Sequence, residues 1–324
     1  MLKIIISLDY EIFGDGSGDV MKHMIKPTET LLSICDQTRN RMTIMLEMME
    51  YIKFREYDKA LVASLGYSPY KMIQTQVLDA YRRGHDVQLH VHPQWYYAEF
   101  RNGQWLMDNP YISFEQIEMN EIYDMITLCK AELESLICSV DMNYQPVAIR
   151  LTNLPWTQPP KKAVEVISQL GFKIHSLAMT TSKNNTEDGY WHLSDTLVEL
   201  PILAFSVPSF KKYTFGRIMT GLYRKSIMKN DVTAVKSKAN SRNIFSCNYD
   251  LKWDFCKQSF KEMRLFLDKA SRHYNSDIAV PLVMIGHSKD FFNSRAFRKF
   301  TEMVNTSTFN EFSTLLDKKV ELVN

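Results

Sequence analysis

The sequence predicts an α/β fold built on parallel β-strands with helices outside them, and two observations lead to this fold class. Residues 2–8 form a continuous apolar run, the pattern expected of a parallel strand that is covered on both faces. After this run, short apolar segments alternate along the chain with longer segments whose apolar residues recur at helical spacing. Strands that alternate with helices in this way imply a parallel sheet with helices outside it.

The strands and helices follow one another in a regular order. Gly84 separates an amphipathic helix from the strand that follows it, since glycine commonly ends helices. Pro93 and Pro201 each end a strand, because proline has no N–H to donate to a neighbouring strand. The expected strands are 2–8, 42–47, 87–91, 145–149, 172–177, 197–201 and 279–285. The expected helices are 27–39, 67–83, 113–139, 161–170, 254–274, 294–305 and 309–318, with a loop or hairpin at 100–108.

The composition is that of an ordinary globular protein. Hydrophobic residues make up 45% and charged residues 23% of the 324 residues, enough for a substantial core, and we expect a single domain over residues 1–324. The net charge of +2 gives no indication of a nucleic-acid partner. Between about 206 and 250 the periodicity weakens and basic residues accumulate, so we expect an insertion or a lid there.

The cysteines and the N-terminal residues favour a cytoplasmic protein. Five cysteines without Cys-x-x-Cys spacing argue against a disulfide framework and against a cysteine-ligated zinc. The apolar run at 2–8 is too short for the core of a signal peptide. No apolar segment approaches the roughly 18 residues that span a bilayer, so we expect no membrane span. The oligomeric state stays open.

Three of the eight histidines lie within residues 84–95. If the apolar part of this stretch is a strand, His90 and His92 point to the same face, because successive side chains alternate. Two imidazoles that converge at the end of a strand can form half of a metal site. Asp9 and Glu11 form a second pair, at the end of a strand whose interior is apolar. Their carboxylates are therefore not an ordinary solvated surface.

Polar residues also follow two later strands. Arg150 comes directly after the strand expected at 145–149, and His287 after the one expected at 279–285. The carboxyl ends of parallel strands meet at one rim, where enzymes of such architecture place their active sites. We therefore predict that both pairs, Arg150 and His287 form one site, and we treat Glu199 as a candidate for the substrate pocket.

These residues stand in motifs that resemble the polysaccharide deacetylases, the NodB-homology group of carbohydrate esterase family 4. The motifs keep the order of the family and extend from Ser7 to Lys289. They comprise an acidic motif at 7–11, a histidine motif at 84–93, Arg150 with Pro155-Trp156 and Gln158-Pro159, and a late histidine motif at 285–289. The resemblance implies a distorted (β/α)7-type barrel of parallel strands with outer helices.

The resemblance also implies a role for each residue of the predicted site. Asp9 would be the catalytic base, His287 the general acid and Arg150 the residue that keeps Asp9 ionised and oriented. The metal ligands would be Glu11, His90 and His92. A carboxylate and two histidines suit a divalent metal, with Zn²⁺ the simplest choice, and leave it an open position for water.

The chain departs from the commonest form of the family in two places. Tyr10 stands where many members have a second aspartate, so the ligand role moves to Glu11. The spacing His-x-His at residues 90–92 replaces His-x-x-x-His, and Gln94 stands where the second histidine commonly falls. Either Gln94 or a water could therefore complete the ligand set.

The implied activity is hydrolysis of a sugar N-acyl amide, with N-acetyl the simplest case, on a precursor of a surface polysaccharide. Trp95, Trp156 and Trp191 could offer flat faces to a sugar ring. Two alternatives stay open: a carbohydrate-binding pseudoenzyme of the same fold, and a metal-dependent hydrolase of another linear or cyclic C–N bond.

Overall fold

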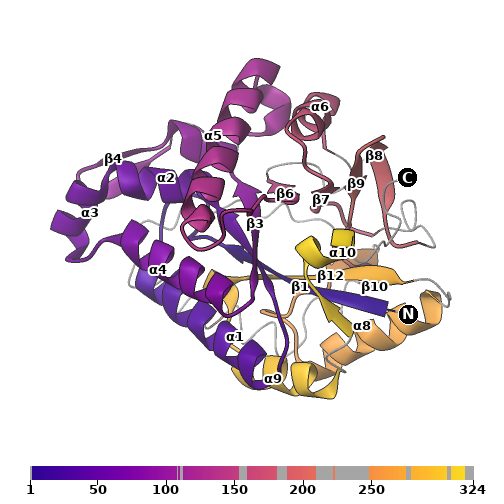
Figure 1. Cartoon of the computed structure of the whole chain (residues 1–324). Helices are drawn as coiled ribbons and strands as arrows, with labels where there is room; N and C mark the ends of the chain where they lie inside the picture. The colour runs from indigo at the N-terminus through magenta and orange to yellow at the C-terminus, as the bar shows by residue number, and fades with distance from the viewer. Residues whose placement is uncertain are drawn as a thin grey trace.

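A curled sheet of parallel strands forms the centre of the protein (Figure 1). The computed structural model describes residues 2–107, 109, 112–152, 159–180, 188–208, 222, 248–274, 279–304 and 308–317. Within these residues seven strands run parallel, in the spatial order β12 (Val280–His287), β1 (Leu2–Tyr10), β2 (Thr43–Glu47), β3 (Asp86–Val91), β6 (Ala148–Leu151), β7 (Ile174–His175) and β9 (Leu197–Glu199). At one edge, β8 (Trp191–Ser194) pairs antiparallel with β9, and the short strand β13 (Phe309–Asn310) pairs in parallel with the first half of β1.

The curled sheet closes on itself just beyond β9. Ile202 pairs in parallel both with Met179 and with Val283 of β12. Leu203 strengthens this junction, since its N–H donates to the carbonyl of Val283 at 3.0 Å. The two sides of the sheet are thus joined through isolated bridges rather than a full strand. This arrangement confirms the predicted distorted barrel of parallel strands.

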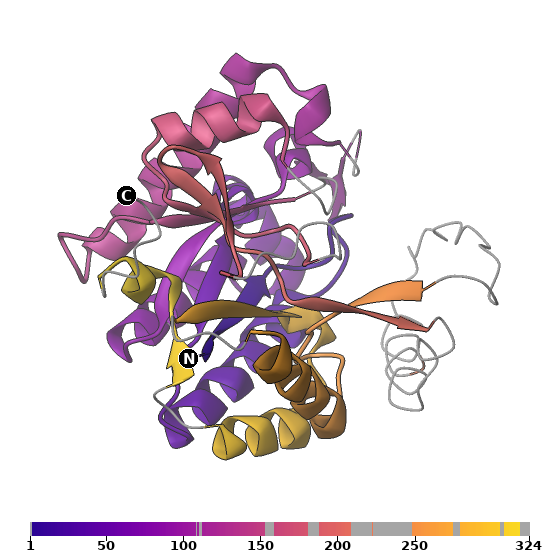
Figure 2. The ribbon, with the colours of Figure 1, turned by 90° about the vertical axis from the view of Figure 1, so that its right-hand side faces the viewer.

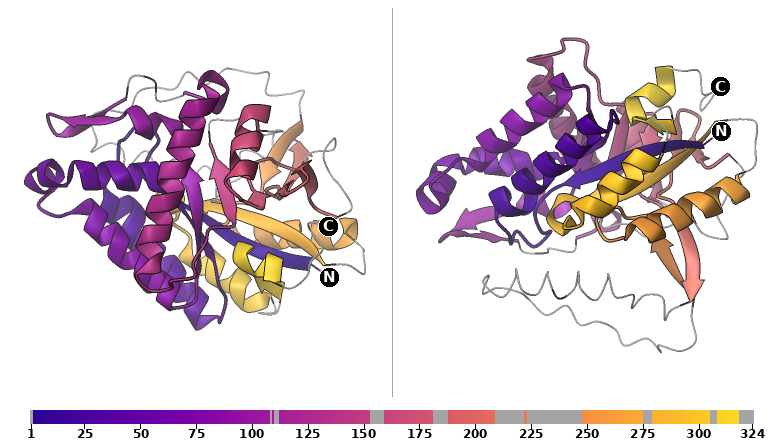
Figure 3. Two further views of the ribbon diagram at one scale, coloured as in Figure 1. Left: turned by 45° about the horizontal axis from the view of Figure 1, so that its top comes forward. Right: turned by 90° about the horizontal axis from the view of Figure 1, so that it is seen from below.

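Helices surround the barrel on its outside (Figure 3). They are α1 (Lys26–Gln37), α2 (Met48–Glu56), α3 (Asp58–Leu65), α4 (Pro69–Arg82), α5 (Met119–Cys138), α6 (Lys161–Gln169), α8 (Phe260–His273) and α9 (Ser294–Met303). In contrast, α10 (Phe312–Asp317) packs against the inside of the barrel. Short turns of other helix types are η1 (Met21–Ile25), η2 (Pro93–Tyr97), η3 (Phe114–Gln116) and η5 (Ser288–Asp290). None of the helices in the described part of the chain has both the length and the apolar character of a bilayer-spanning segment.

The alternation of side chains along β1 separates two apolar cores. Leu8 belongs to the larger core, which lies between the barrel and the helices. Ile5 belongs to the smaller core inside the barrel, together with Phe312 of α10. Because side chains two residues apart share a face, Asp9 points into the barrel like Ile5. Asp9 therefore reaches the interior at the carboxyl end of its strand.

Among the described residues, two antiparallel pairs of strands lie outside the barrel sheet. The hairpin of β4 (Glu99–Arg101) and β5 (Gln104–Leu106) stands where a loop or hairpin was predicted. The strands β10 (Ala204–Pro208) and β11 (Asn248–Lys252) form a ribbon that extends away from the barrel (Figure 2). This ribbon flanks the predicted insertion at 206–250, most of which lies outside the described residues. The insertion and the single-domain organisation stay predictions.

Several elements are shorter than the sequence pattern indicated. The expected helix 254–274 begins only at Phe260, because Asp254 Oδ1 accepts the N–H groups of Cys256 and Lys257 and forms a turn instead. Ser259 then caps α8 by accepting the N–H of Glu262 at 3.3 Å. Hydrogen bonds from side chains to the backbone therefore override the apolar periodicity at this helix start.

Candidate metal centre at the rim of the barrel

The register of strand pairing places the predicted site residues in adjacent positions. Asp9 of β1 pairs with His287 of β12. His90 of β3 pairs with Arg150 of β6 on one side and with Glu47 of β2 on the other. Neighbouring strands lie ~4.8 Å apart, so inward-pointing side chains at paired positions are neighbours in space. The convergence of these residues is therefore a direct consequence of the parallel sheet.

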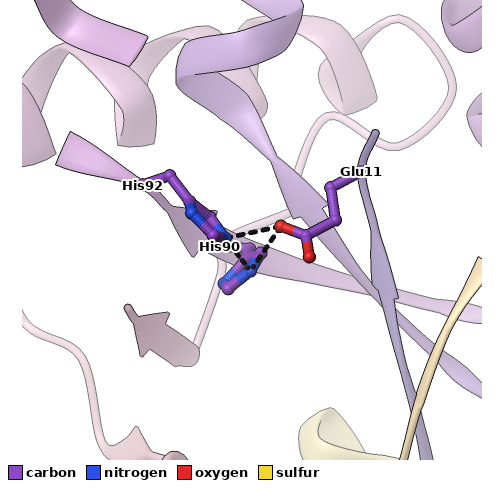
Figure 4. A group of neighbouring side chains, drawn as sticks. All are labelled: Glu11, His90 and His92. Atoms are coloured by element: carbon purple, nitrogen blue, oxygen red, sulfur yellow. Dashed lines mark hydrogen bonds and ion pairs between the residues drawn. The ribbon is translucent and has the colours of Figure 1, made fainter. Parts of the chain in front are cut away.

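Glu11, His90 and His92 direct one donor atom each toward a common point (Figure 4). Glu11 Oε2 lies 2.5 Å from His92 Nε2 and 3.3 Å from His90 Nε2. The two Nε2 atoms are 3.1 Å apart, and all three side chains are buried. A tetrahedral zinc ion with bonds of ~2.0–2.2 Å separates its donor atoms by about 3.3 Å. These donors therefore fit a single divalent ion.

The ring of His90 has the orientation that a metal ligand needs. Its Nδ1–H donates to the carbonyl of Arg150 at 2.9 Å, which directs Nε2 toward Glu11. In His92, Nδ1 lies 3.0 Å from the amide nitrogen of Gln94, so Nε2 carries the proton and donates to Glu11. A cation bound at His92 Nε2 would displace that proton.

Gln94 does not lie where a metal ligand would. Its side-chain nitrogen lies 3.0 Å from Nδ1 on the far side of the His92 ring and donates to the carbonyl of Gly14 at 3.2 Å. The possibility that Gln94 completes the ligand set is therefore wrong for this structure. Gln94 instead orients the ring of His92 and joins it to the loop that follows β1.

Asp9 lies beside the three proposed ligands, between the side chains of Arg150 and His287. Its Oδ1 accepts a hydrogen bond from the guanidinium of Arg150. Its Oδ2 lies 3.4 Å from His287 Nε2 and 4.0 Å from His90 Nε2. Arg150 is itself anchored, since its Nε donates to the carbonyl of Ser176 at 2.6 Å. The Asp9 carboxylate is thus held in one orientation with one oxygen free to act toward the site.

Neighbouring positive charges and hydrogen-bond donors keep the two acids of the site ionised. Burial raises the pKa of Asp9, but Arg150, with a contribution from His90, more than offsets this effect, so the pKa lies below its ordinary value. Burial also raises the pKa of Glu11, and His92 and Lys289 outweigh it, so the pKa lies well below its ordinary value. Both carboxylates are therefore charged at neutral pH.

The side chain of His287 is uncharged at neutral pH. Burial lowers the pKa of His287 to about 4, although the charge of Asp9 acts in the opposite direction. Its Nδ1 is buried and has no hydrogen-bond partner in the described part of the chain. The neutral ring carries a proton on one nitrogen only, so its other nitrogen can receive a proton from a neighbour and pass it on.

A second group of potential ligands overlaps the first. Asp9, Glu11 and His287 also offer donor atoms within 4.8 Å of one another. Here, however, Arg150 binds Asp9, and Lys289 Nζ lies 2.6 Å from Glu11 Oε1. Two fixed positive charges against these carboxylates oppose the binding of a further cation. This group is therefore better suited to proton transfer than to a second metal.

Lys289 and Glu47 belong to the site, but sequence reasoning assigned no role to either. Lys289 stands in the late histidine motif, and its Nζ also donates to the carbonyl of Ile12 at 2.8 Å. Glu47 is the last residue of β2, and its side chain accepts the N–H of His92 at 2.8 Å. The sequence did contain an indication for Glu47, because this residue ends a buried strand, as the residues of the predicted site do.

The predicted sugar contact at Trp95 is wrong. Its side chain is only 1% exposed, because the ring lies in the core with its centroid 5.8 Å from Phe54 and 5.0 Å from Trp105. Trp105 is half-buried and lines a cavity of 440 Å³ together with Phe100. Trp156, the second predicted contact, lies outside the described residues.

The predicted place of Glu199 in a substrate pocket is also wrong. Its side chain is fully buried, and one oxygen binds Nδ1 of His175. The other oxygen accepts the N–H groups of Leu177 and Ala178 at 2.8 and 2.7 Å. Both oxygens are therefore occupied, and Glu199 stabilises the segment that follows β7.

Comparisons with known proteins extend these observations. No family model matches the chain, and no curated protein matches it in sequence. A solved structure assigned as a polysaccharide deacetylase from Mycobacterium smegmatis is similar with a TM-score of 0.53 and 13% identity, over 100% of this chain and 92% of that one. An allantoinase is similar with a TM-score of 0.51 and 10% identity, over 98% and 89%.

A third solved structure is much longer than this chain. It is a 4-alpha-glucanotransferase from Thermococcus litoralis, with a TM-score of 0.54 and 9% identity. The likeness covers 98% of this chain but 40% of the glucanotransferase. At such low sequence identities the similarity is one of fold. The chain therefore has the distorted barrel fold of the polysaccharide deacetylases, the fold that the resemblance of its motifs implied.

Proposed function

We propose that the chain is a metal-dependent hydrolase that removes an N-acyl group, in particular an acetyl group, from an amino sugar in a precursor of a surface polysaccharide. The observation that supports it most is the convergence of Glu11, His90 and His92 beside the Asp9–Arg150 pair. The fold shared with a polysaccharide deacetylase is consistent with this chemistry. Zn²⁺ is the metal that we propose, since two imidazoles and a carboxylate are frequent ligands of catalytic zinc.

The residues of the site divide the hydrolysis among them. An ion held by Glu11, His90 and His92 would supply Lewis acidity, polarising the acyl carbonyl and making water more acidic. Asp9 is ionised and would accept the proton of the attacking water. Arg150 keeps the carboxylate oriented during this transfer, because Ser176 anchors its guanidinium.

His287 would deliver a proton to the leaving nitrogen. The ring is neutral at rest, so its proton must arrive during the reaction. Asp9 Oδ2 lies 3.4 Å away and holds the proton taken from water, which can pass to His287 Nε2 and then to the amine. Water thus contributes its hydroxyl to the acyl group and a proton to nitrogen, and the products are a carboxylic acid and a free amino sugar.

Replacement of His287 by glutamine (His287→Gln) is expected to lower kcat/KM for an N-acetyl sugar by ~10²–10⁴-fold, the usual contribution of a general acid. Metal affinity should stay unchanged, because His287 is not among the proposed ligands. The loss should be much smaller for an acetanilide with an electron-withdrawing ring, whose leaving amine needs less protonation. An equal loss for both substrates would contradict the role of His287 as general acid.

The proposed function is tested by measuring acetate release from N-acetyl amino sugars, their nucleotide-linked forms and short oligosaccharides. The measurement is repeated after treatment with a chelator and again after zinc is restored. We expect activity on at least one of these substrates, loss of activity with the chelator and recovery with zinc. Activity that survives complete removal of metal would contradict the proposal.

The similarity to an allantoinase favours a second candidate function, hydrolysis of another linear or cyclic C–N bond at the same metal site. The residues proposed for proton transfer would serve such a reaction equally well. Profiling with ureides and cyclic amides separates the two candidates. Hydrolysis of a ureide without acetate release from any sugar would favour this second function.

Of the two alternatives to the hydrolase of sugar amides, the position of Lys289 favours the carbohydrate-binding pseudoenzyme. Its ion pair with Glu11 reduces the negative charge that a cation needs, since Nζ lies 2.6 Å from Oε1. Metal analysis of the purified protein distinguishes the cases. Sugar binding without stoichiometric zinc would favour a carbohydrate-binding protein over the hydrolase.

A further inference from the structure

Two buried carboxylates begin helix α2, next to the proposed metal centre. Glu47 is the last residue of β2 and the N-cap of α2, and Glu50 lies in the first turn of the helix. Each side chain is only 1% exposed. Burial of carboxylates is costly unless their oxygens accept hydrogen bonds. The partners of these oxygens therefore indicate what the pair does.

The partners lie on the segments that carry the proposed metal ligands. Glu47 Oε1 accepts the backbone N–H of His92 at 2.8 Å, and its Oε2 accepts the N–H of Glu50. Glu50 accepts the backbone N–H of Ile12 with both oxygens, each at 3.2 Å. One helical turn thus holds the backbone of one ligand, His92, and of the residue that follows another ligand, Glu11.

Helix capping accounts for only one of these contacts. A carboxylate at the N-cap that accepts an N–H of the first turn is a common way to begin a helix, and it also suits the helix dipole. That role explains the bond from Glu50 to Glu47. It does not explain why the remaining oxygens leave the helix and bind the chain after β1 and after β3.

The sheet itself does not hold these two positions. The pairing of β1 with β2 ends at Tyr10, and the pairing of β2 with β3 ends at His90. Glu11 and His92 both lie beyond these last pairs, where no backbone bond of the described ladder joins them to β2. The oxygens of Glu47 and Glu50 provide the missing connection across β2.

We propose that Glu47 and Glu50 are positioning residues of the metal centre. They extend the connection between β1, β2 and β3 past the end of the ladder, and they hold Glu11 and His92 at a separation that suits one ion. This inference rests on the proposed metal site. Contacts behind the ligands commonly change metal affinity or activity by ~10–100-fold when they are removed.

The shorter side chain of aspartate separates positioning from capping. In the variant Glu47→Asp the carboxyl group is kept and α2 retains a favourable N-cap residue. One methylene fewer prevents the carboxylate from reaching both the N–H of Glu50 and the N–H of His92. We expect the affinity for Zn²⁺, measured by competition with a chromophoric chelator, to fall by ~10–100-fold. The urea midpoint of the metal-free protein should stay near that of the wild type.

Asp86→Asn is the matched control. Asp86 is a buried carboxylate at the opposite end of β3, where it accepts hydrogen bonds from Thr43 at 2.9 Å and from Gln88 at 2.8 Å. Its replacement alters the same two strands far from the ligands, so zinc affinity should not change. Wild-type zinc affinity in Glu47→Asp, or an equal loss in Asp86→Asn, would overturn the positioning role.

A second measurement needs no metal. The ¹⁵N NMR signals of the His92 ring in the metal-free protein report its tautomer, which its contacts with Glu11 and Gln94 determine. We expect these signals to shift or broaden in Glu47→Asp and to stay unchanged in Asp86→Asn. If the wild-type protein binds no zinc, the proposed function fails, while an unchanged His92 signal in Glu47→Asp overturns the positioning role separately.

Discussion

Replacement of His90 by alanine (His90→Ala) is expected to abolish zinc binding at the rim of the barrel and to lower kcat/KM for acetyl release by at least about a thousandfold. The reason is the central place of His90 in the ligand group, where its Nε2 lies within 3.3 Å of both other donor atoms. Loss of the Lewis acid removes several kcal/mol of transition-state stabilisation. Zinc stoichiometry and acetate release measure the two effects.

His85 offers a matched control for this prediction. Like His90 it is buried, but its ring binds Asp36 at 3.2 Å and the N–H of Met42 at 3.3 Å instead of the metal group. The change His85→Ala should cost stability and leave zinc stoichiometry intact. A His90→Ala protein that keeps one zinc and ordinary activity would show that the metal site lies elsewhere.

The change Arg150→Met is expected to destabilise the protein by ~3–5 kcal/mol, because it leaves the charge of Asp9 buried and unpaired. Both side chains are almost entirely buried, with Arg150 at 0% and Asp9 at 4% exposure. Methionine keeps much of the apolar contact but supplies no positive charge. Urea unfolding of the metal-free protein measures the loss, and acetate release should fall with it because Asp9 is no longer oriented.

The double variant Asp9→Asn/Arg150→Met separates the effect on stability from the effect on catalysis. Removal of both charges should recover most of the lost stability, since no unpaired buried charge remains. Activity should stay lost, because asparagine cannot accept the proton of water. A single variant Arg150→Met as stable as the wild type would contradict the buried ion pair.

The juxtaposition of most residues of the candidate metal centre could be predicted from local sequence patterns. The alternation of side chains in a strand places His90 and His92 on one face, and the end of the apolar run at Asp9 places it at the carboxyl end of β1. Both arguments use only neighbouring residues. They place these residues together because a parallel sheet brings all carboxyl ends to one rim.

The predictions that failed depended on distant parts of the chain. Trp95 follows the ligands directly, yet Phe54 and the hairpin residue Trp105 enclose it. Glu199 lies at the end of a buried strand as Asp9 does, but His175 and the segment after β7 occupy its oxygens. Position at a strand end therefore selects candidates, and the packing of other segments decides which of them remain free to act.

By itself the sequence determined the parallel α/β class, the strand ends that carry polar residues, and the shared face of His90 and His92. Only the tertiary structure decided that Glu11 lies 2.5 Å from His92, that Gln94 lies behind the ring, and that Glu47 holds the His92 backbone. The physical reason is the separation along the chain of the residues that determine each feature. Alternation and strand termini are properties of adjacent residues, whereas these contacts join β1, β2 and β3 through a register that barrel closure and the start of α2 impose.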